Sequence, residues 1–197
     1  MSNARPRSLR LSTGAPTIEV LTLSPPTLHA LAAGDLTGAE RTSGLALPEV
    51  FVAEGWIGTW RYRSAQVRDD PATAAWITGA VWDPATAQVV GKAGYHGPPD
   101  EAGMVEVGYA VVPELRRRGY ARAALELLLR RAAAEPAVRV VRASVRPDNL
   151  ASLALIGAYG FVAVGEQDDE EDGLEIIFEV GAQHPRQRLT RVDGSAS

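Results

Sequence analysis

The chain has 197 residues, 46% of them hydrophobic, which is enough for one well-buried domain and gives no sign of two. Its formal net charge of -4 argues against a general nucleic-acid-binding surface, and the lack of cysteine excludes disulfides, a thiolate nucleophile and thiolate metal ligands. With three scattered histidines, no metal site is expected. We predict polar tails at 1–16 and 182–197 around one domain at 17–181. Without a membrane span or secretory signal, the protein is expected to be cytoplasmic.

The first half of the domain is predicted to alternate between strands and helices. The expected elements are a strand at 17–23, a helix at 25–35 with proline in its first turn, a helix within 47–62, and strands at 74–83 and 87–97. The last two strands flank the turn 83–86, so they form a hairpin, which the loop 97–103 follows.

The second half shows clearer patterns. We expect a strand at 104–112, a helix at 120–133, a strand at 138–145, a helix at 149–160, and a closing hairpin of 161–166 and 174–180 across the acidic turn 167–173. The helix at 120–133 is predicted from apolar residues at helical spacing, such as Ala121, Leu125 and Leu128. This order of elements predicts a single α/β or α+β domain with helices packed on a mixed sheet.

The stretch "PELRRRGYARAALELLLRRA", at 113–132, places Arg116, Arg117 and Arg118 before Gly119 at the start of a predicted helix. The first N–H groups of a helix lack partners and carry the positive end of its dipole, so they favour an anion. Gly119 removes a side chain that would block close approach, and Ala121 is nearly as small. The alternative is that these are ordinary solvated arginines before a helix.

Two sequence blocks together resemble the GNAT superfamily of N-acetyltransferases. "VGYAVVPELRRRGYARAAL" resembles motif A of the family, Q/R-x-x-G-x-G/A, with Arg116, Gly119 and Ala121 at its fixed positions. "NLASLALIGAYGF" is similar to the family's asparagine, helix and Gly-Phe signature, at Asn149 and 160–161. The resemblance covers about residues 17–180 and is closest to the subgroup resembling ribosomal-protein N-terminal (RimJ/RimL-like) acetyltransferases. It implies a mixed, mostly antiparallel sheet of about seven strands with about four helices packed on it.

The resemblance also implies a place for acetyl-CoA, as cosubstrate, between two splayed strands at 104–112 and 138–145. The backbone of Tyr109, Ala110 and Val111 would pair with the pantetheine arm like an added strand, and Asn149 would hold the far end of that arm or order the loop. The expected pyrophosphate-binding residues are those of the loop: Arg116, Arg117, Arg118, Gly119, Tyr120, Ala121 and Arg122. Neither a covalent acyl-enzyme nor a metal is expected.

Glu106 is the candidate general base, because an acceptor amine must be neutral when it attacks a thioester. Strand alternation puts Glu106, Gly108 and Ala110 on one face and Val105, Val107 and Tyr109 on the other. A carboxylate therefore stands where a core strand usually buries apolar groups. The alternative is a strand-end glutamate that reaches water. A lysine side chain, with a pKa near 10.4, costs about 3 kcal/mol more to deprotonate than an α-amine with a pKa of about 8. A modest carboxylate therefore suits an α-amine better.

The general acid is less clear, because the family's usual tyrosine, seven residues after Asn149, is replaced by Ile156. Tyr159 is not its equivalent. Ser152 lies three residues after Asn149, where the RimJ/RimL-like subgroup has a serine that is the proposed acid. The alternative for Ser152 is a first-turn helix serine that hydrogen-bonds to backbone.

The acceptor is predicted only as a primary amine, either a protein N-terminal α-amine or a small molecule. A pocket could be lined by Trp56, Trp60, Tyr62, Trp82, Tyr95 and His96, although such aromatic residues mostly belong to a core. His96 could assist proton transfer. The acidic run 168–172 could steer a cationic acceptor or be a solvated hairpin tip.

Two other classes of function compete with an enzyme. One is a catalytically silent acyl-CoA-binding sensor, and the other is a phosphate or nucleic-acid module that uses the arginines without chemistry. We favour the enzyme, acting as a monomer or homodimer on acetyl-CoA and an amine acceptor, with no nucleic-acid or membrane partner.

Overall fold

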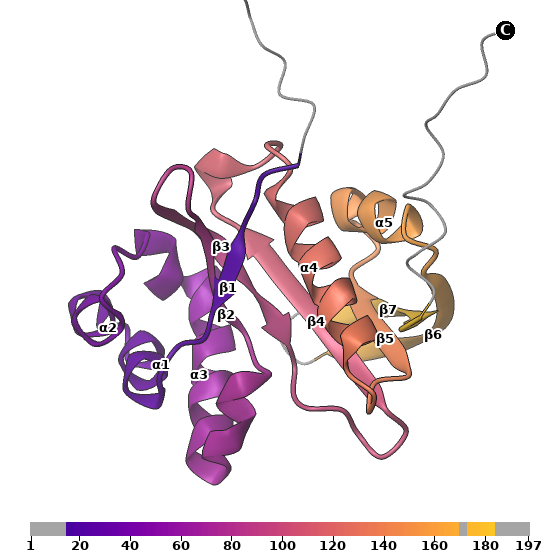
Figure 1. Cartoon of the computed structure of the whole chain (residues 1–197), viewed down its shortest axis with the longest axis horizontal. Helices are drawn as coiled ribbons and strands as arrows, with labels where there is room; N and C mark the ends of the chain where they lie inside the picture. The colour runs from indigo at the N-terminus through magenta and orange to yellow at the C-terminus, as the bar shows by residue number, and fades with distance from the viewer. Residues whose placement is uncertain (1–14, 170–172, 184–197) are drawn as a thin grey trace, which may run out of the picture.

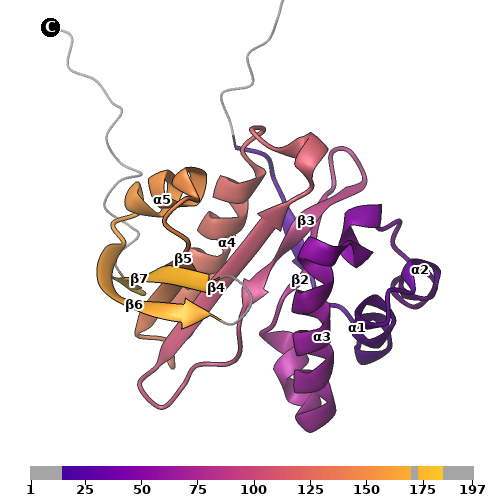
Figure 2. The same cartoon turned by 180° about the vertical axis from the view of Figure 1, so that it is seen from behind.

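The computed structural model describes residues 15–169 and 173–183, and these form one sheet with helices on both faces (Figures 1 and 2). The strands lie in the order β1-β2-β3-β4-β5-β7-β6. Their bounds are β1 Glu19–Leu21, β2 Gly79–Asp83, β3 Gln88–Tyr95, β4 Met104–Val111, β5 Val140–Val145, β6 Val162–Asp169 and β7 Gly173–Gly181. Every pair of neighbours is antiparallel except β4 and β5, which are parallel. The predicted mixed, mostly antiparallel sheet of about seven strands is therefore confirmed.

Five α-helices cover the sheet in the described residues: α1 Pro25–Ala32, α2 Leu36–Ser43, α3 Glu54–Asp69, α4 Tyr120–Ala134 and α5 Leu150–Gly157. The first three lie on one face and the last two on the other, as Figures 1 and 2 show from opposite sides. Each face has its own hydrophobic core. One centres on Phe51, Trp60 and Leu28, and the other joins α4 and α5 to the sheet. None of the described helices is both long and apolar enough to cross a membrane.

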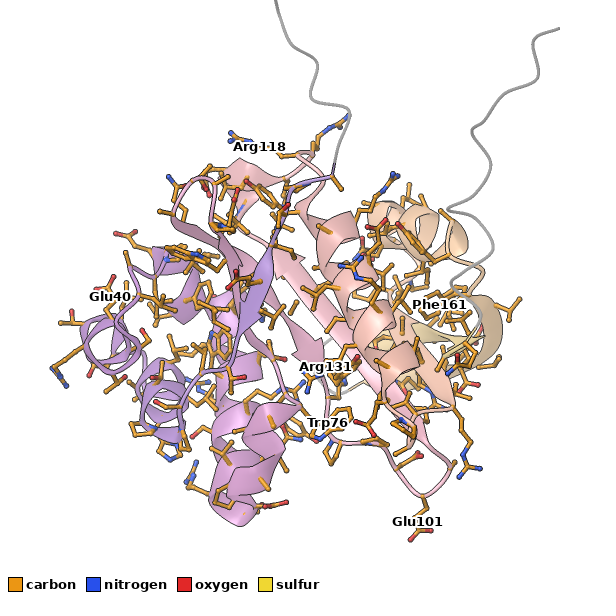
Figure 3. The ribbon with its side chains drawn as sticks, in the orientation of Figure 1. Glu40, Trp76, Glu101, Arg118, Arg131 and Phe161 are labelled. Atoms are coloured by element: carbon orange, nitrogen blue, oxygen red, sulfur yellow. The ribbon has the colours of Figure 1, made fainter. Side chains whose placement is uncertain are left out.

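Several predicted boundaries need correction. The strand expected at 74–83 begins only at Gly79, because Pro71–Ala75 form a short 3-10 helix capped by the carboxylate of Asp70. The ring of Trp76 then lies 5.1 Å from the guanidinium carbon of Arg131, which fastens this segment to α4 (Figure 3). The helix within 47–62 is divided into a 3-10 turn, Glu49–Val52, and α3, which continues to Asp69.

Two further differences concern the helix count and the domain end. Helix α2 was not predicted, and it is held by the Asp35 carboxylate at its start and by Gly44, with φ 72°, at its end. Ala182, expected in the C-terminal tail, is buried, and its N–H donates to the carbonyl of Arg139 at 2.9 Å. The core thus extends past 181, while the rest of the predicted tails, 1–14 and 184–197, lies outside the described residues.

Strands β4 and β5 are paired only where they begin. Their register joins Met104 to Val140, Val105 to Val141 and Glu106 to Arg142, and it records no pair beyond these three. On its other side, β4 continues to pair with β3 through residues 107–111. The two parallel strands therefore diverge after Glu106, as the family resemblance implies, and the edge of β4 that faces β5 is left open.

Candidate functional site

A cavity of about 400 Å³ opens where β4 and β5 diverge. The lining residues that matter most here are Gly55, Thr59 and Arg63 of α3, Lys92 and His96 on or just after β3, Glu106, Gly108, Tyr109 and Ala110 of β4, Ser144 of β5, and Asn149 and Ser152 at the start of α5. Thr78, Arg146, Gln167 of β6 and Glu175 of β7 line the cavity as well. The cavity therefore brings together both predicted catalytic residues with Tyr109, Ala110 and Asn149 from the predicted cofactor set.

Glu106 projects into this cavity as the alternation of β4 requires. Its neighbours Val105 and Val107 are buried in the core beneath α4, whereas Glu106 lines the cavity with a side chain that is 17% exposed. The hydroxyl of Ser144 donates a 2.6 Å hydrogen bond to Glu106 Oε1. Sequence reasoning missed Ser144, although its alternation in β5 with the buried residues Ala143 and Val145 places it on the cavity side.

His96 lies beside the carboxylate of Glu106. Its Nδ1 is 3.8 Å from Glu106 Oε1, and its backbone N–H donates to the Glu106 carbonyl at 2.8 Å. The His96 carbonyl accepts from Nη1 of Arg63 at 3.0 Å and from Nε2 of Gln66 at 2.7 Å, so the backbone there is held from two sides. A Cβ on Gly108 would stand 3.1 Å from His96 Nε2, so the glycine leaves room for the imidazole ring.

Asn149 and Ser152 occupy the first turn of α5. The Asn149 side chain caps the helix, since its Oδ1 accepts from the Ser152 N–H at 3.2 Å. The Ser152 side chain forms a hydrogen bond with Tyr109, and this bond lowers the phenol's pKa against the larger effect of burial, which raises it. Ile156 is 1% exposed and belongs to the core, so no proton donor stands where the family's tyrosine is expected.

The predicted pyrophosphate loop has the backbone shape of an anion site. Arg117 and Gly119 both have positive φ, 61° and 90°, and Gly119 precedes the first residue of α4. Within the described residues, no backbone hydrogen bond uses the N–H groups of 117–122. Arg116 and Arg118 donate to nearby carbonyls at 3.3 Å, and Arg118 lies at the outer edge of the molecule (Figure 3). The N–H groups of the loop are thus available to an anion.

Tyr120 anchors this loop to the β2–β3 hairpin. Its hydroxyl donates a 2.6 Å hydrogen bond to Oδ2 of Asp83, whose Oδ1 accepts from the N–H of Ala85 at 2.8 Å. The bond raises the pKa of Tyr120, with burial adding to the effect, and it lowers the pKa of Asp83 against the opposing effect of burial. Sequence reasoning placed Tyr120 among the cofactor-binding residues without this partner, 37 residues away.

Of the two interpretations left open for the aromatic residues, core membership applies to most of them. Of the six residues proposed, His96 is the one found among those lining the cavity. Trp56 and Trp60 are buried in the core beneath α3, and Tyr62 is 61% exposed. Tyr95 is fully buried and donates its hydroxyl to the Leu128 carbonyl at 2.6 Å. Residues 170–172 of the acidic run lie outside the described residues.

Sequence reasoning also missed Lys92 and Thr59, which line the cavity from β3 and α3. One signal was present: Lys92 is the single lysine of the chain, in which the other nineteen basic residues are arginine.

The comparisons with known proteins agree with this geometry. The sequence pattern of the family described as "Acetyltransferase (GNAT) domain" matches residues 23–162, so the chain belongs to the GNAT acetyltransferase family. A curated relative, the uncharacterized N-acetyltransferase YjdG of Bacillus subtilis (strain 168), is 36% identical over 75 residues. That match spans 38% of this chain and 45% of the relative.

Solved structures share the fold at low sequence identity. A ribosomal-protein-S5-alanine acetyltransferase from Vibrio fischeri is 16% identical with a TM-score of 0.56, over 84% of this chain and 92% of that one. A chimera built from the spermidine N-acetyltransferase SpeG of Vibrio cholerae is also 16% identical, with a TM-score of 0.60. That match covers 87% of this chain and 98% of the chimera. Since these proteins differ in the acceptors that their names state, the shared fold leaves the acceptor of this chain to be argued from its own residues.

Proposed function

We propose that this chain is an acetyl-CoA-dependent N-acetyltransferase that acetylates a primary amine by direct attack in a ternary complex. The observation that carries the proposal is the cavity at the divergence of β4 and β5, into which Glu106 and Ser152 project from opposite elements. The open strand edge can pair with the extended arm of a thioester cosubstrate. The carboxylate can take a proton from the acceptor amine.

The chain's own groups fit the cosubstrate that its family uses. The N–H groups of 117–122 suit a pyrophosphate, and the positive φ of Gly119 shapes the loop that presents them. The open edge of β4 at Tyr109, Ala110 and Val111 suits the amides of a pantetheine arm. The side-chain oxygen of Asn149, a residue that lines the cavity, caps α5, so its amide NH₂ remains as a potential donor.

Acetyl-CoA supplies an activated acetyl thioester. Glu106 removes a proton from the acceptor ammonium, directly or through a water, with Ser144 holding its carboxylate and His96 beside it. The neutral amine nitrogen then bonds to the acetyl carbonyl carbon, the carbon–sulfur bond breaks, and the nitrogen loses its second proton to water. Ser152 gives its hydroxyl proton to the departing thiolate, and Tyr109, which shares a hydrogen bond with Ser152, can restore that proton.

The experiment that tests this proposal is an acetyl-CoA consumption screen across N-terminal peptides, lysine peptides, polyamines, aminoglycosides and amino acids, combined with calorimetric binding of acetyl-CoA. Turnover with any amine, with the product acetylated at nitrogen, supports the proposal. Tight acetyl-CoA binding without turnover across the whole panel would instead favour a silent acyl-CoA-binding sensor. Absence of acetyl-CoA binding would reject both functions.

A further inference from the structure

The acceptor side of the cavity has a fixed arrangement of charge. Three residues of α3, at Gly55, Thr59 and Arg63, are spaced four apart and therefore form one stripe on the helix face that lines the cavity. Opposite them lies the β3–β4 surface, where Lys92 is paired with Ala110. The space between this helix and this surface is where an acceptor can approach Glu106.

Lys92 is held in the wall of this space. It is only 8% exposed, its Nζ donates to Thr59 Oγ1 at 2.6 Å, and the same nitrogen lies 4.8 Å from the ring centre of Trp56 and 5.5 Å from that of Trp60. The faces of these aromatic rings stabilise a positive charge that burial would otherwise penalise. The ammonium is thus fixed in place rather than free to swing into solvent.

Arg63 adds a second positive charge from α3. It is 4% exposed, and its Nε and Nη1 are held by Thr78, Gln66 and the His96 carbonyl. Burial lowers its pKa to about 10, with Tyr62 and Glu106 acting in the opposite direction, so Arg63 stays protonated at neutral pH. The space between α3 and the β3–β4 surface is therefore lined by two fixed cations, Lys92 near Thr59 and Arg63 nearer to His96 and Glu106.

The negative charge lies at the other end of this surface. Glu106 is four residues from Ala110, the partner of Lys92, and this separation is about 13 Å along the strand. Ala110, Gly108 and Glu106 share one face of β4, where the His96 ring lies over Gly108. A ligand in the cavity can therefore pass beside that ring between Lys92 and Glu106. Such a surface orients a dipolar ligand with its amine toward Glu106 and an anion toward Lys92.

We propose, resting on the function proposed above, that the acceptor amine carries a carboxylate, which Lys92 binds while the amine faces Glu106. A second ammonium at that position, as in a polyamine, would meet the Lys92 ammonium instead of an anion. The carboxylate belongs either to a small amino acid or to an acidic side chain near a peptide N-terminus, and the two arms of the test separate these sources.

The test compares matched acceptors that differ in one group. The small-molecule arm uses γ-aminobutyrate, its amide and putrescine, and the peptide arm uses the C-terminal amides of alanyl-glutamate, alanyl-glutamine and alanyl-lysine. In at least one arm, the acceptor with a carboxylate is expected to have a kcat/KM about tenfold higher than the matching amide. Its advantage over the acceptor with a second cation, putrescine or the alanyl-lysine amide, should be larger still. Lys92→Met should bring the carboxylate-to-amide ratio close to one. The matched control Arg61→Met removes an exposed positive charge on the same helix and should leave the ratio unchanged.

A second measurement does not depend on turnover. Because Lys92 is the single lysine, labelling lysine with carbon-13 at Cε gives one side-chain signal, which γ-aminobutyrate should shift and putrescine should not. Cation-bearing acceptors that react as fast as carboxylates, or a ratio unaffected by Lys92→Met, would overturn this inference and leave the proposed function standing. If no amine reacts, the proposed function fails, and the lysine signal alone decides whether a carboxylate binds.

Discussion

The hydroxyl of Tyr120, the first residue of α4, donates a 2.6 Å hydrogen bond to the buried carboxylate of Asp83 at the end of β2. This bond joins the predicted pyrophosphate loop to the β2–β3 hairpin, which lies on the far side of β4 from β5. The loop that precedes α4 is therefore positioned by β2, a strand that contributes no residue to the lining of the candidate cavity.

Tyr120→Phe is expected to destabilise the protein by about 1.5–3 kcal/mol, because it leaves the Asp83 carboxylate buried without this donor. It should also weaken acetyl-CoA binding through the loop. Chemical denaturation and calorimetry measure the two effects. Tyr62→Phe, which removes the hydroxyl of an exposed tyrosine, is the control and should change neither quantity.

The same bond makes a prediction for the pH dependence of stability. It lowers the pKa of Asp83 below its ordinary 3.8 and raises that of Tyr120 above its ordinary 10.0. The contribution of Asp83 to the free energy of unfolding is complete above pH 3.8. It is lost as the pH falls through the lower pKa that the carboxyl has in the folded state. The contribution of Tyr120 to the free energy of unfolding is complete below pH 10.0. It is lost as the pH rises through the higher pKa that the phenol has in the folded state.

The free energy of unfolding of the wild type should therefore exceed that of Tyr120→Phe by a constant amount between about pH 5 and pH 9, and the gap should narrow on both sides. Denaturant titrations of both proteins across this range measure it. A gap that stays constant down to acid pH would show that the bond does not depend on the ionised carboxylate.

Glu106→Gln is expected to lower kcat by about a hundredfold or more, since the amide cannot accept the amine proton. The amide oxygen can still accept from Ser144, so the cavity should keep its shape and acetyl-CoA affinity should remain within about threefold. Steady-state kinetics and calorimetry provide these values. Unchanged turnover would exclude Glu106 as the base.

Gly119→Glu is expected to abolish acetyl-CoA binding, whereas Arg117→Ala should only weaken it. A side chain at position 119 must adopt φ 90° and place its Cβ 3.1 Å from Cδ of Pro16, and the added carboxylate would oppose a pyrophosphate. Arg117→Ala removes one exposed charge and leaves the backbone N–H groups in place. Calorimetric titration ranks the two, and the reverse order would mean that charge rather than backbone forms the site.

Ser152→Ala and Tyr109→Phe separate the two candidates for protonating the thiolate. If Ser152 gives the proton and Tyr109 restores it, the serine variant should lose about tenfold or more in kcat and the tyrosine variant less. Measuring kcat with a thioester of a more acidic thiol supplies the control, because a better leaving group needs no acid. An equal defect in Ser152→Ala with both thioesters would assign Ser152 a purely structural role at the start of α5.

The elements around the cavity were predictable because their patterns are local. The apolar spacing of α4 and the alternation of β4 placed the start of the helix at Tyr120 and Glu106 on the cavity side. Helix α2 was not found, because "LTGAERTS" has little apolar content and depends on Asp35, Gly44 and packing against α1.

The partners of the site residues could not be predicted, because each contact joins segments far apart in the chain. Ser144 reaches Glu106 through the register of a parallel strand pair, which no turn fixes. Lys92 meets Thr59 only once α3 lies across β3. Trp56 and Trp60, which belong to the core, contact this lysine with their ring faces, and no local pattern predicted that contact.

The divergence of β4 and β5 leaves the middle of the sheet one strand short, with main-chain groups that water must satisfy in the free protein. A ligand that supplies the missing hydrogen bonds adds to the free energy of unfolding by mass action, about 2.7 kcal/mol at a hundredfold excess over its Kd. If acetyl-CoA is that ligand, as proposed above, the melting temperature of this protein should rise with the acetyl-CoA concentration.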